Sequence, residues 1–354
     1  MGEMHACSVP RDGENRITNG CGRRSAVALT CALAFLVSLI SCEALRVLAS
    51  KKALLDRPNE RSLHTLPTPR LGGLGLVGAT LLVVLPLAMH AHSETRALLG
   101  ASAGVACLGL VDDFRPLPAS LRLLVQLAAS AAFLWLVGVP KALLFSNVSI
   151  ELPPIVIGAL LTIWMTGVLN IYNFMDGMDG LAGSQAVTAG AGTAVLMAAG
   201  APELTLVSAV LAASSGGFLM HNFPPARIFM GDAGSTFVGF ALAALVVLGM
   251  HHGVPFAVTA LLLTPFLLDG TFTIVRRALR REAIWRAHRS HLYQRAVQTG
   301  LGHRDVLLVY AAWMAMTFAG GMWNPIAGWA ASLGAFVWVW RWVLSRESKK
   351  MGLA

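Results

Sequence analysis

Charged residues are scarce in this chain of 354 residues, since only 13% are Asp, Glu, Lys or Arg. A soluble domain carries about 25% charged residues, so most of this protein's surface faces something other than water. Hydrophobic residues make up 56% of the chain, and the mean hydropathy is +0.66. The composition excludes an ordinary soluble protein and indicates an integral membrane protein.

Cys-x-x-Cys motifs and internal repeats are also absent, although Cys7 and Cys21 could form a disulfide if the N-terminal tail lies outside. None of the five cysteines stands in a Cys-x-x-Cys pair, which disfavours zinc-ribbon and dithiol chemistry. No repeat of 20–50 residues is visible, nor an inverted pair of broken helices of the transporter kind. The net charge of +9 is explained by basic loops at a membrane surface, so we expect no nucleic-acid partner.

Apolar runs long enough to cross a bilayer recur along the chain. A run of about 20 apolar residues spans a hydrocarbon core. They fall at about 26–49, 71–92, 96–111, 119–139, 154–172, 181–199, 203–221, 234–251, 254–274, 305–322 and 325–345. The sequence therefore predicts an all-α polytopic membrane bundle of about 10–11 transmembrane helices. Its divisions are a polar N-terminal tail (1–25), one transmembrane catalytic domain (26–345) and a C-terminal tail (346–354).

The loops between these segments differ in polarity on the two sides of the membrane. Of the 27 Lys and Arg residues, 19 fall on one side and 6 on the other. The basic side is cytoplasmic by the positive-inside rule. Its connectors hold the Asp-, His- and Gly-rich stretches, at 50–70, 112–118, 173–180, 222–233 and 275–304. We therefore expect one active face, open to cytoplasmic substrates and bordered by lipid.

The first motif is a pair of carboxylates, Asp112 and Asp113, at the end of the third apolar segment. Adjacent acids at an apolar helix end are costly to bury unless they are paired or bind a metal. Hard oxygen ligands suit Mg2+, which binds through one or two carboxylates and substrate phosphates. A solvated helix end before Pro116 is the alternative interpretation.

The second motif places four polar side chains at every third position: Asn170, Asn173, Asp176 and Asp179. On a helix this spacing keeps neighbours on roughly one side. Gly177 and Gly180 would then break the helix and let the backbone approach a ligand. The pattern predicts an oxygen-rich wall beside a turn.

The third motif is Asp232, which has a glycine at 231 and lies before the eighth apolar segment. We expect the helix to begin near Gly234, with Ser235 as a cap and free N–H groups for a phosphate. Together with the other motifs, Asp232 is the leading candidate for a metal ligand.

Two basic loops are candidates for anion binding. The loop 275–304 contains His288, Arg289 and His291, which could neutralise a pyrophosphate; a zinc site is a weaker option there. The Pro-rich loop before Gly72 contains Thr68 and Arg70, which could hold a phosphate headgroup or only mark the cytoplasmic side. Asp269 lies inside the ninth apolar segment and could pair with Arg276 or Arg277.

In this order, the five motifs resemble the polyprenyl-phosphate N-acetylhexosamine-1-phosphate transferase superfamily, glycosyltransferase family 4, over about residues 50–345. The resemblance implies a helix bundle around a cytoplasmic cleft. It implies catalytic roles for Asp112, Asp113 and Asp232, and Mg2+ (or Mn2+ in its place) at Asn173 and Asp232. It places Asp176 near the pyrophosphate, Asp179 at the uracil, and His288 and His291 at the sugar diphosphate. From the residues themselves we expect the other candidates to bind substrate as well: Asn170, Arg289, Thr68 and Arg70.

The histidine motif is similar to that of the subgroup that initiates O-antigen-type glycans, and it lacks the consecutive His triplet of the muropeptide enzymes. This implies transfer of a sugar-1-phosphate from a UDP-N-acetyl amino sugar (GlcNAc, FucNAc or QuiNAc) to undecaprenyl phosphate, with release of UMP. It also implies a bacterial inner-membrane enzyme whose active site faces the cytoplasm; a homodimer is compatible with it. The alternatives are a phospho-MurNAc-pentapeptide transferase and, in a different class, a secondary transporter.

Overall fold

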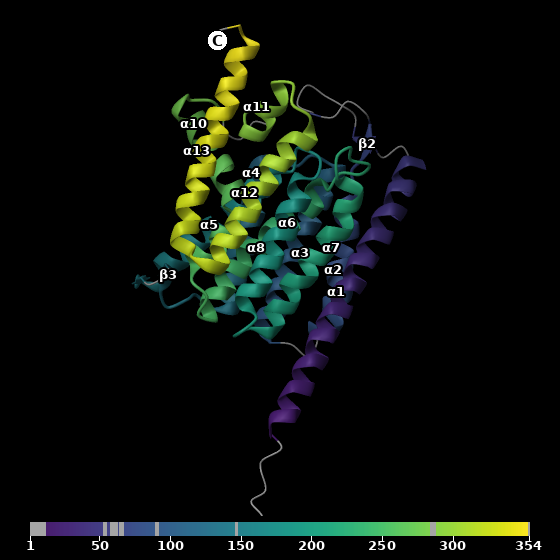
Figure 1. Cartoon of the computed structure of the whole chain (residues 1–354), viewed down its shortest axis with the longest axis vertical. Helices are drawn as coiled ribbons and strands as arrows, with labels where there is room; N and C mark the ends of the chain where they lie inside the picture. Colours follow the sequence, from purple (N-terminus) through teal and green to yellow (C-terminus); the bar gives the residue numbers. More distant parts are fainter. Residues whose placement is uncertain are drawn as a thin grey trace, which may run out of the picture.

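A computed structural model describes residues 12–51, 55–56, 63, 67–88, 92–145, 148–283 and 288–352. The protein is a bundle of long helices with two short pairs of strands at its ends (Figure 1). Parts of five predicted segments lie outside the described residues: 1–11 of the N-terminal tail, 52–54, 57–62 and 64–66 of the first basic loop, 89–91 of the second apolar segment, 284–287 of the histidine loop, and 353–354 of the C-terminal tail.

The described chain forms thirteen helices and four strands. The helices are α1 (Asp12–Lys51), α2 (Gly72–Ala88), α3 (Ser93–Phe114), α4 (Ala119–Val137), α5 (Pro154–Met175), α6 (Leu181–Met197), α7 (Pro202–Asn222), α8 (Gly231–His251), α9 (Phe256–Leu261), α10 (Thr264–Leu279), α11 (Leu292–Gln298), α12 (His303–Trp323) and α13 (Pro325–Lys350). Strand β1 (Leu55–Asp56) pairs antiparallel with β2 (Thr68–Pro69), and β3 (Leu143–Phe145) pairs antiparallel with β4 (Val148–Ile150).

The predicted helical membrane bundle is confirmed. Each of the eleven apolar segments is helical, and within the described residues seven helices are long and apolar enough to cross a membrane: α1 (from Ser25), α3, α4, α5, α7, α8 and α12. Helices α2 and α6 have 17 residues each, and the ninth segment is divided into α9 and α10. Helix α1 already begins at Asp12, inside the polar tail, and continues without a break into the first span.

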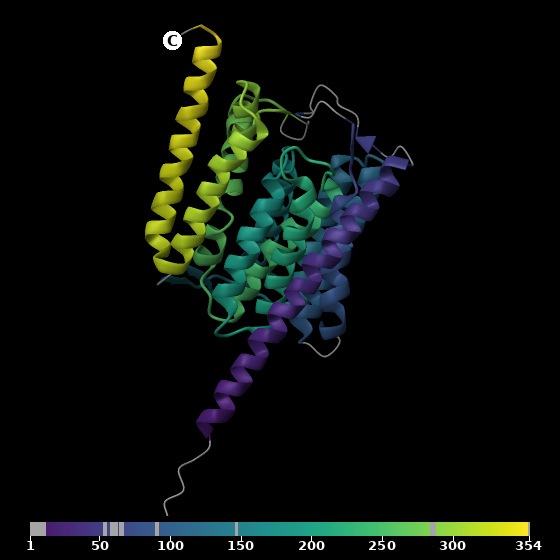
Figure 2. The same ribbon diagram turned by 45° about the vertical axis from the view of Figure 1, so that its right-hand side comes forward.

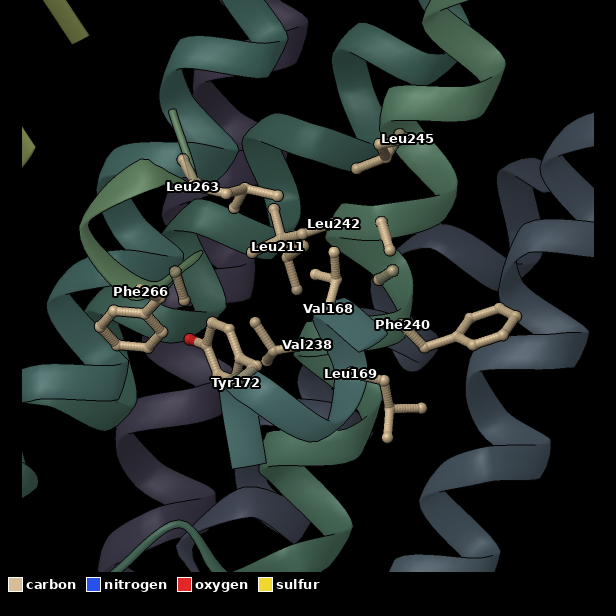
Figure 3. Packing of buried hydrophobic residues seen from close by; sticks show 14 of the residues in the cluster. Val168, Leu169, Tyr172, Leu211, Val238, Phe240, Leu242, Leu245, Leu263 and Phe266 are labelled. Atoms are coloured by element: carbon tan, nitrogen blue, oxygen red, sulfur yellow. The ribbon is translucent and has the colours of Figure 1, made fainter. Parts of the chain in front are cut away.

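Helix α8 is the centre of the bundle. Its residues from Ala233 to Met250 are all buried, and it packs against α2, α3, α5 and α6. A helix that is apolar on every side is stable only when other helices surround it. Figure 3 shows Val238 and Leu242 of α8 among side chains of α5, α7 and α10, such as Tyr172, Leu211 and Phe266.

Successive helices run in opposite directions, so the C-terminal ends of α3, α5 and α7 meet the N-terminal ends of α4, α6 and α8. They meet at the end of the bundle where α11 and β2 lie (Figure 1). Helix α1 crosses the bundle obliquely, and α13 extends beyond it on the side of α11 (Figure 2). All five polar motifs therefore gather at one end, which we call the polar end.

Close contact between α3 and α8 depends on Gly109. A Cβ atom at this position would lie 2.4 Å from the backbone oxygen of Asp232. Gly104, one and a half turns earlier on α3, has open space where its Cβ would be.

We expect Gly109→Ala to lower the stability of the fold by about 1–3 kcal/mol, because the two backbones must move apart. The matched control Gly104→Ala should be neutral or slightly stabilising, since alanine favours a helix. Thermal unfolding in detergent measures both. Equal midpoints for the two variants would show that the α3–α8 contact can relax without cost.

Candidate functional site

A cavity of about 140 Å³ opens at the polar end between α3, α4, α5 and α8. Its polar lining comes from motifs that are far apart in the sequence. The polar and charged side chains that line it are Asp112, Arg122, Gln126, Asn170, Asn173, Asp232 and Thr236. We predicted that the paired aspartates, the asparagines and Asp232 converge. The cavity confirms this for four of them: Asp112, Asn170, Asn173 and Asp232.

Arg122 lies between the two carboxylates of this cavity. Its guanidinium forms a short ion pair with Asp112 and lies 3.8 Å from Oδ2 of Asp232. The backbone N–H of Leu117 donates to Oδ1 of Asp112 at 2.6 Å. Asp112 is thus held by two donors, with only 7% of its side chain exposed.

Asp113 has a different role from its neighbour, because it faces α8 rather than the cavity. Its two oxygens accept the backbone N–H groups of Asp232 (2.9 Å) and Ala233 (3.0 Å). These groups have no partner within their own helix, so Asp113 caps α8 from α3. The sequence-based assignment of a cap to Ser235 is wrong: α8 begins at Gly231, and Ser235 donates back to the Gly231 carbonyl at 3.0 Å.

Three backbone hydrogen bonds join the segment around Arg70 to the segment that precedes α8, and they place Arg70 beside the carboxylates. The N–H of Phe229 donates to Pro69, and those of Gly72 and Gly73 donate to Phe229 and Met230. Arg70 then lies 3.7 Å from both Asp113 and Asp232. Thr68, in β2, is buried. Gly231 makes the approach possible, since its φ is +75° and a Cβ there would lie 2.6 Å from the Arg70 carbonyl.

The polar side chains spaced by three do not form one continuous wall. Asn170 donates to Gln126 at 2.7 Å and Asn173 donates to Ser235 at 3.1 Å, both at the cavity. Asp179 is turned away: it accepts the Ala226 N–H at 3.0 Å and pairs with His303 at 3.1 Å. The helix ends at Met175, so the helical spacing stops before the last two acids.

Asp176 follows α5 and belongs to the same electrostatic cluster. Desolvation raises the pKa of its carboxyl well above the usual range. The charges of Asp232 and Asp113 raise this pKa further, and Arg70 opposes them. A carboxyl whose pKa is strongly shifted by burial and by neighbouring charges is a candidate for a functional site.

The histidine loop folds into α11, which the sequence did not predict. His291 precedes this helix and is buried, whereas Arg289 is exposed. The His288 ring lies 5.0 Å from the His291 ring and 6.4 Å from Phe174, the residue after Asn173. Desolvation, together with the positive charges of Arg277 and Arg276, lowers the pKa of His288 to about 4. His288 is therefore neutral at pH 7.

This shift predicts a pH dependence of stability. The ordinary pKa of His is about 6.5, so between about pH 6.5 and pH 4 the unfolded chain binds a proton at this position that the folded chain does not. Stability is therefore lost as the pH falls through this window. We expect the unfolding temperature of the wild type to fall more between pH 7.5 and pH 4.5 than that of His288→Gln. Equal decreases in the unfolding temperatures of the two proteins would show that the His288 side chain is solvated in the folded state.

The donor set at the cavity fits a magnesium ion. Within the described residues no three Asp, Glu, His or Cys side chains gather as a complete metal cage. Mg2+ does not need one, because it binds through one or two carboxylates and completes its shell with phosphate oxygens and water. Asp232 and Asn173 offer a carboxylate and an amide oxygen, and the Arg122 guanidinium already lies between Asp112 and Asp232. The geometry thus provides a place for positive charge.

The chain matches known proteins over the same region. The model of the family described as glycosyl transferase family 4 matches residues 95–250, which include Asp112, Asn173 and Asp232. A probable undecaprenyl-phosphate N-acetylglucosaminyl 1-phosphate transferase of Bacillus subtilis is 32% identical over 78% of this chain and 80% of its own length. The chain belongs to glycosyl transferase family 4. This confirms the resemblance to the polyprenyl-phosphate N-acetylhexosamine-1-phosphate transferases, so the protein is a multi-pass membrane enzyme that transfers a sugar phosphate.

Two further relatives of this family 4 enzyme differ in the substrate that their names give. A decaprenyl-phosphate N-acetylglucosaminephosphotransferase of Mycobacterium tuberculosis is 33% identical over 88% of this chain and 86% of its own length. A phospho-N-acetylmuramoyl-pentapeptide-transferase of Acaryochloris marina is 36% identical, but over only 57% of this chain and 58% of its own length.

Sequence reasoning missed several residues of the family 4 site. Arg122, Gln126 and Thr236 line the cavity although they lie inside apolar segments. A basic residue in the first turn of α4, just after the Pro116–Pro118 break that follows Asp112, was the available signal for Arg122. For Gln126 and Thr236 the sequence offers no comparable signal.

Proposed function

We propose that this enzyme transfers an N-acetyl amino sugar-1-phosphate from a UDP-sugar to undecaprenyl phosphate, giving undecaprenyl-diphosphate-sugar and UMP, with Mg2+ as cofactor. The product would initiate a lipid-linked cell-surface polysaccharide of the O-antigen type. The observation that carries the proposal is the convergence of Asp112, Asn173 and Asp232 from three helices on one cavity. The names of the relatives favour GlcNAc as the sugar.

The reaction is a phosphoryl transfer. An oxygen of the lipid phosphate attacks the β-phosphorus of the UDP-sugar, the bond from that phosphorus to the UMP oxygen breaks, and UMP leaves with the electron pair. A bound Mg2+ would neutralise the pyrophosphate and stabilise charge on the leaving oxygen. Asp232 and Asn173 would hold it, and Arg70 and Arg122 would place two further positive charges beside the reacting phosphates.

Direct attack by the lipid is favoured over a covalent aspartyl-phosphate. The second pKa of a phosphate monoester is near 6, so the lipid nucleophile is already ionised at pH 7. Asp112 is engaged by Arg122 and the Leu117 N–H, an arrangement suited to orienting that phosphate or accepting its proton. A donor that is chiral at the β-phosphorus distinguishes the paths: inversion supports direct attack, and retention requires the intermediate.

Arg122 is our candidate for the lipid phosphate. It lies at the start of α4, whose outer face exposes Leu121, Leu124 and Val125 to the surroundings. A cation beside an apolar helix face suits a phosphate attached to a polyprenyl chain.

We expect Arg122→Ala to raise the KM for undecaprenyl phosphate by about 10-fold or more while changing the KM for the UDP-sugar much less, because one charge-assisted contact is lost. Arg122→Lys keeps the positive charge, so the KM for undecaprenyl phosphate should rise less in this variant. Arg96→Ala, at the opposite end of α3, is the matched control and should behave as wild type. An equal rise in both KM values would assign Arg122 to the nucleotide instead.

The polar end is proposed to face the cytoplasm, in the bacterial inner membrane. The excess of Lys and Arg on this side supports that orientation. In a variant whose five native cysteines are replaced by serine, a cysteine placed in the exposed turn near Gly300 should react with an impermeant thiol reagent only after the membrane is permeabilised. Labelling in intact cells would show that the polar end faces away from the cytoplasm.

A direct assay tests the function. Purified protein is incubated with undecaprenyl phosphate, Mg2+ and single UDP-sugars (GlcNAc, FucNAc, QuiNAc and MurNAc-pentapeptide), and the lipid product is identified by mass. We expect product with one of the first three donors. Product only with MurNAc-pentapeptide would establish the runner-up, which the shorter match to the Acaryochloris marina relative supports less well. No product with any donor would contradict the proposal and reopen the transporter alternative.

A further inference from the structure

Asp269 of α10 is a fully buried carboxylate that the proposed reaction does not use. The expectation that it pairs with Arg276 or Arg277 is wrong: the side chains of those arginines bond to the carbonyls of Ser290 and Ala283. A buried carboxylate is stable only when donors surround it, so its actual partners are informative.

Those partners come from α11 and α12, and from Thr273 of α10 itself, whose hydroxyl donates to Oδ1 at 3.3 Å. The N–H of Leu292 donates to Oδ1 at 2.9 Å, and the N–H of Tyr293 donates to Oδ2 at 3.3 Å. The hydroxyl of Tyr310 donates to Oδ2 at 2.6 Å. Asp269 therefore caps the short helix α11 from another helix, as Asp113 caps α8.

The same carboxylate also faces His291. Oδ1 lies 3.5 Å from Nδ1 of this ring, which is only 1% exposed. Neither ring nitrogen has a hydrogen-bond partner in the part of the chain that the structure describes: Nδ1 meets Asp269 only at this ion-pair distance, and Nε2 meets no acceptor or donor. A buried ring nitrogen without a partner is costly, so a donor or acceptor from a bound ligand would stabilise it.

The first turn of α11 is docked on the segment that carries Asn173 and Asp176. The hydroxyl of Tyr293 donates to the Phe174 carbonyl at 3.0 Å. The His291 ring lies 6.3 Å from the Phe174 ring. The His291 ring is therefore buried beside the segment that follows the cavity residue Asn173.

We propose that Asp269 is a positioning residue of the transfer reaction, which holds His291 with Nδ1 toward the carboxylate so that Nε2 is presented to the sugar diphosphate. A carboxylate acceptor favours the tautomer with the proton on Nδ1 and fixes the plane of the ring. This inference rests on the proposed function, because His291 must touch the UDP-sugar for its orientation to matter.

A double-mutant cycle tests whether Asp269 acts through His291. Asp269→Asn keeps the shape of the side chain and should lower kcat by about 10- to 100-fold. In the His291→Gln background the same substitution should cost no more than about threefold, because the group it positions is gone. An equal loss in both backgrounds would overturn the proposal and leave Asp269 a structural cap.

Tyr310→Phe is the matched control, since it removes a 2.6 Å hydrogen bond to the same carboxylate without touching His291. It should lower the unfolding temperature but leave kcat within about threefold of wild type. A loss of activity as large as that of Asp269→Asn would contradict positioning through His291.

A second readout does not depend on turnover. The 15N spectrum of histidine-labelled wild type, with His291 assigned by its absence in His291→Gln, should show the proton on Nδ1. A proton on Nε2 in the wild type would overturn the inference, even if Asp269→Asn does not fold. An inactive wild type with Nδ1 protonated would instead count against the proposed function alone.

Discussion

Asp232→Ala should abolish sugar-phosphate transfer, with a loss of about 1,000-fold or more in kcat, while the protein stays folded. The side chain lines the cavity and supplies the carboxylate that we assign to Mg2+, so its removal withdraws the charge stabilisation that the reaction needs. The hydrogen bond that fixes the start of α8 uses the backbone N–H of Asp232, which alanine retains. Removal of one charge from a crowded group of acids should leave the unfolding temperature unchanged or raise it.

Asp305→Ala is the matched control for this prediction. Asp305 is also an acid in the first turn of a helix, at the start of α12, but it is exposed and does not line the cavity. UMP release and thermal unfolding should both be close to wild type in this variant. Normal turnover by Asp232→Ala would remove Asp232 from the mechanism, and a strongly lowered unfolding temperature would mean that the loss reflects unfolding.

Asp113→Ala is expected to lower both stability and activity, unlike substitutions at the cavity. It leaves the N–H groups of Asp232 and Ala233 without their acceptors, at a cost of about 1–3 kcal/mol. Without this cap the start of α8 can move and carry Asp232 with it. We therefore also expect sugar-phosphate transfer to be about 100-fold slower. A displacement of about 1 Å at a reacting centre is enough for such a loss.

The two aspartates can be separated by a comparison of their asparagine variants. Asp113→Asn keeps one acceptor oxygen and should retain more stability and activity than Asp113→Ala. Asp112→Asn should lose activity without a comparable loss of stability, because it does not cap a helix. Unfolding temperatures and initial rates on the same samples check this contrast. A stable but inactive Asp113→Ala would give Asp113 a direct chemical role, as the family resemblance implied.

The sequence predicted the bundle well because the bilayer imposes a strong pattern on it. Each apolar segment became a helix, and the polar motifs gather at one end because successive spans alternate in direction. Antiparallel threading alone brings Asp112, Asn173 and Asp232 to the same face of the membrane. Their convergence could therefore be anticipated from the order of the spans.

The sequence did not show which residue of each motif lines the cavity and which stabilises a helix. Asp112 and Asp113 are neighbours on one helix, but only the position of α8 decides which of them faces the cavity and which caps a helix. Helix α11 was missed because it is short and polar and depends on Asp269, which lies 23 residues before its first residue. These roles are set by contacts between helices, and a periodicity along the chain does not contain them.

Helix ends also limited the prediction of the asparagine and aspartate motif. A three-residue spacing keeps side chains together only while the helix lasts, and α5 ends at Met175. Asn170 and Asn173 therefore share the cavity, while Asp179 instead joins His303 and the Ala226 N–H. Gly177 and Gly180 indicated that the helix ends here, but not where the side chains beyond its end would turn.

The central claim is that Asp232 and Asn173 hold a divalent ion, beside Asp112, at a nucleotide diphosphate. Its most direct test is a crystal structure of the enzyme with UDP and Mn2+, in which anomalous scattering locates the ion. We predict one Mn2+ in the cavity, bound to the Asp232 carboxylate at about 2.2 Å and to a diphosphate oxygen. An ion or nucleotide bound away from Asp232, or at the opposite end of the bundle, would contradict the account.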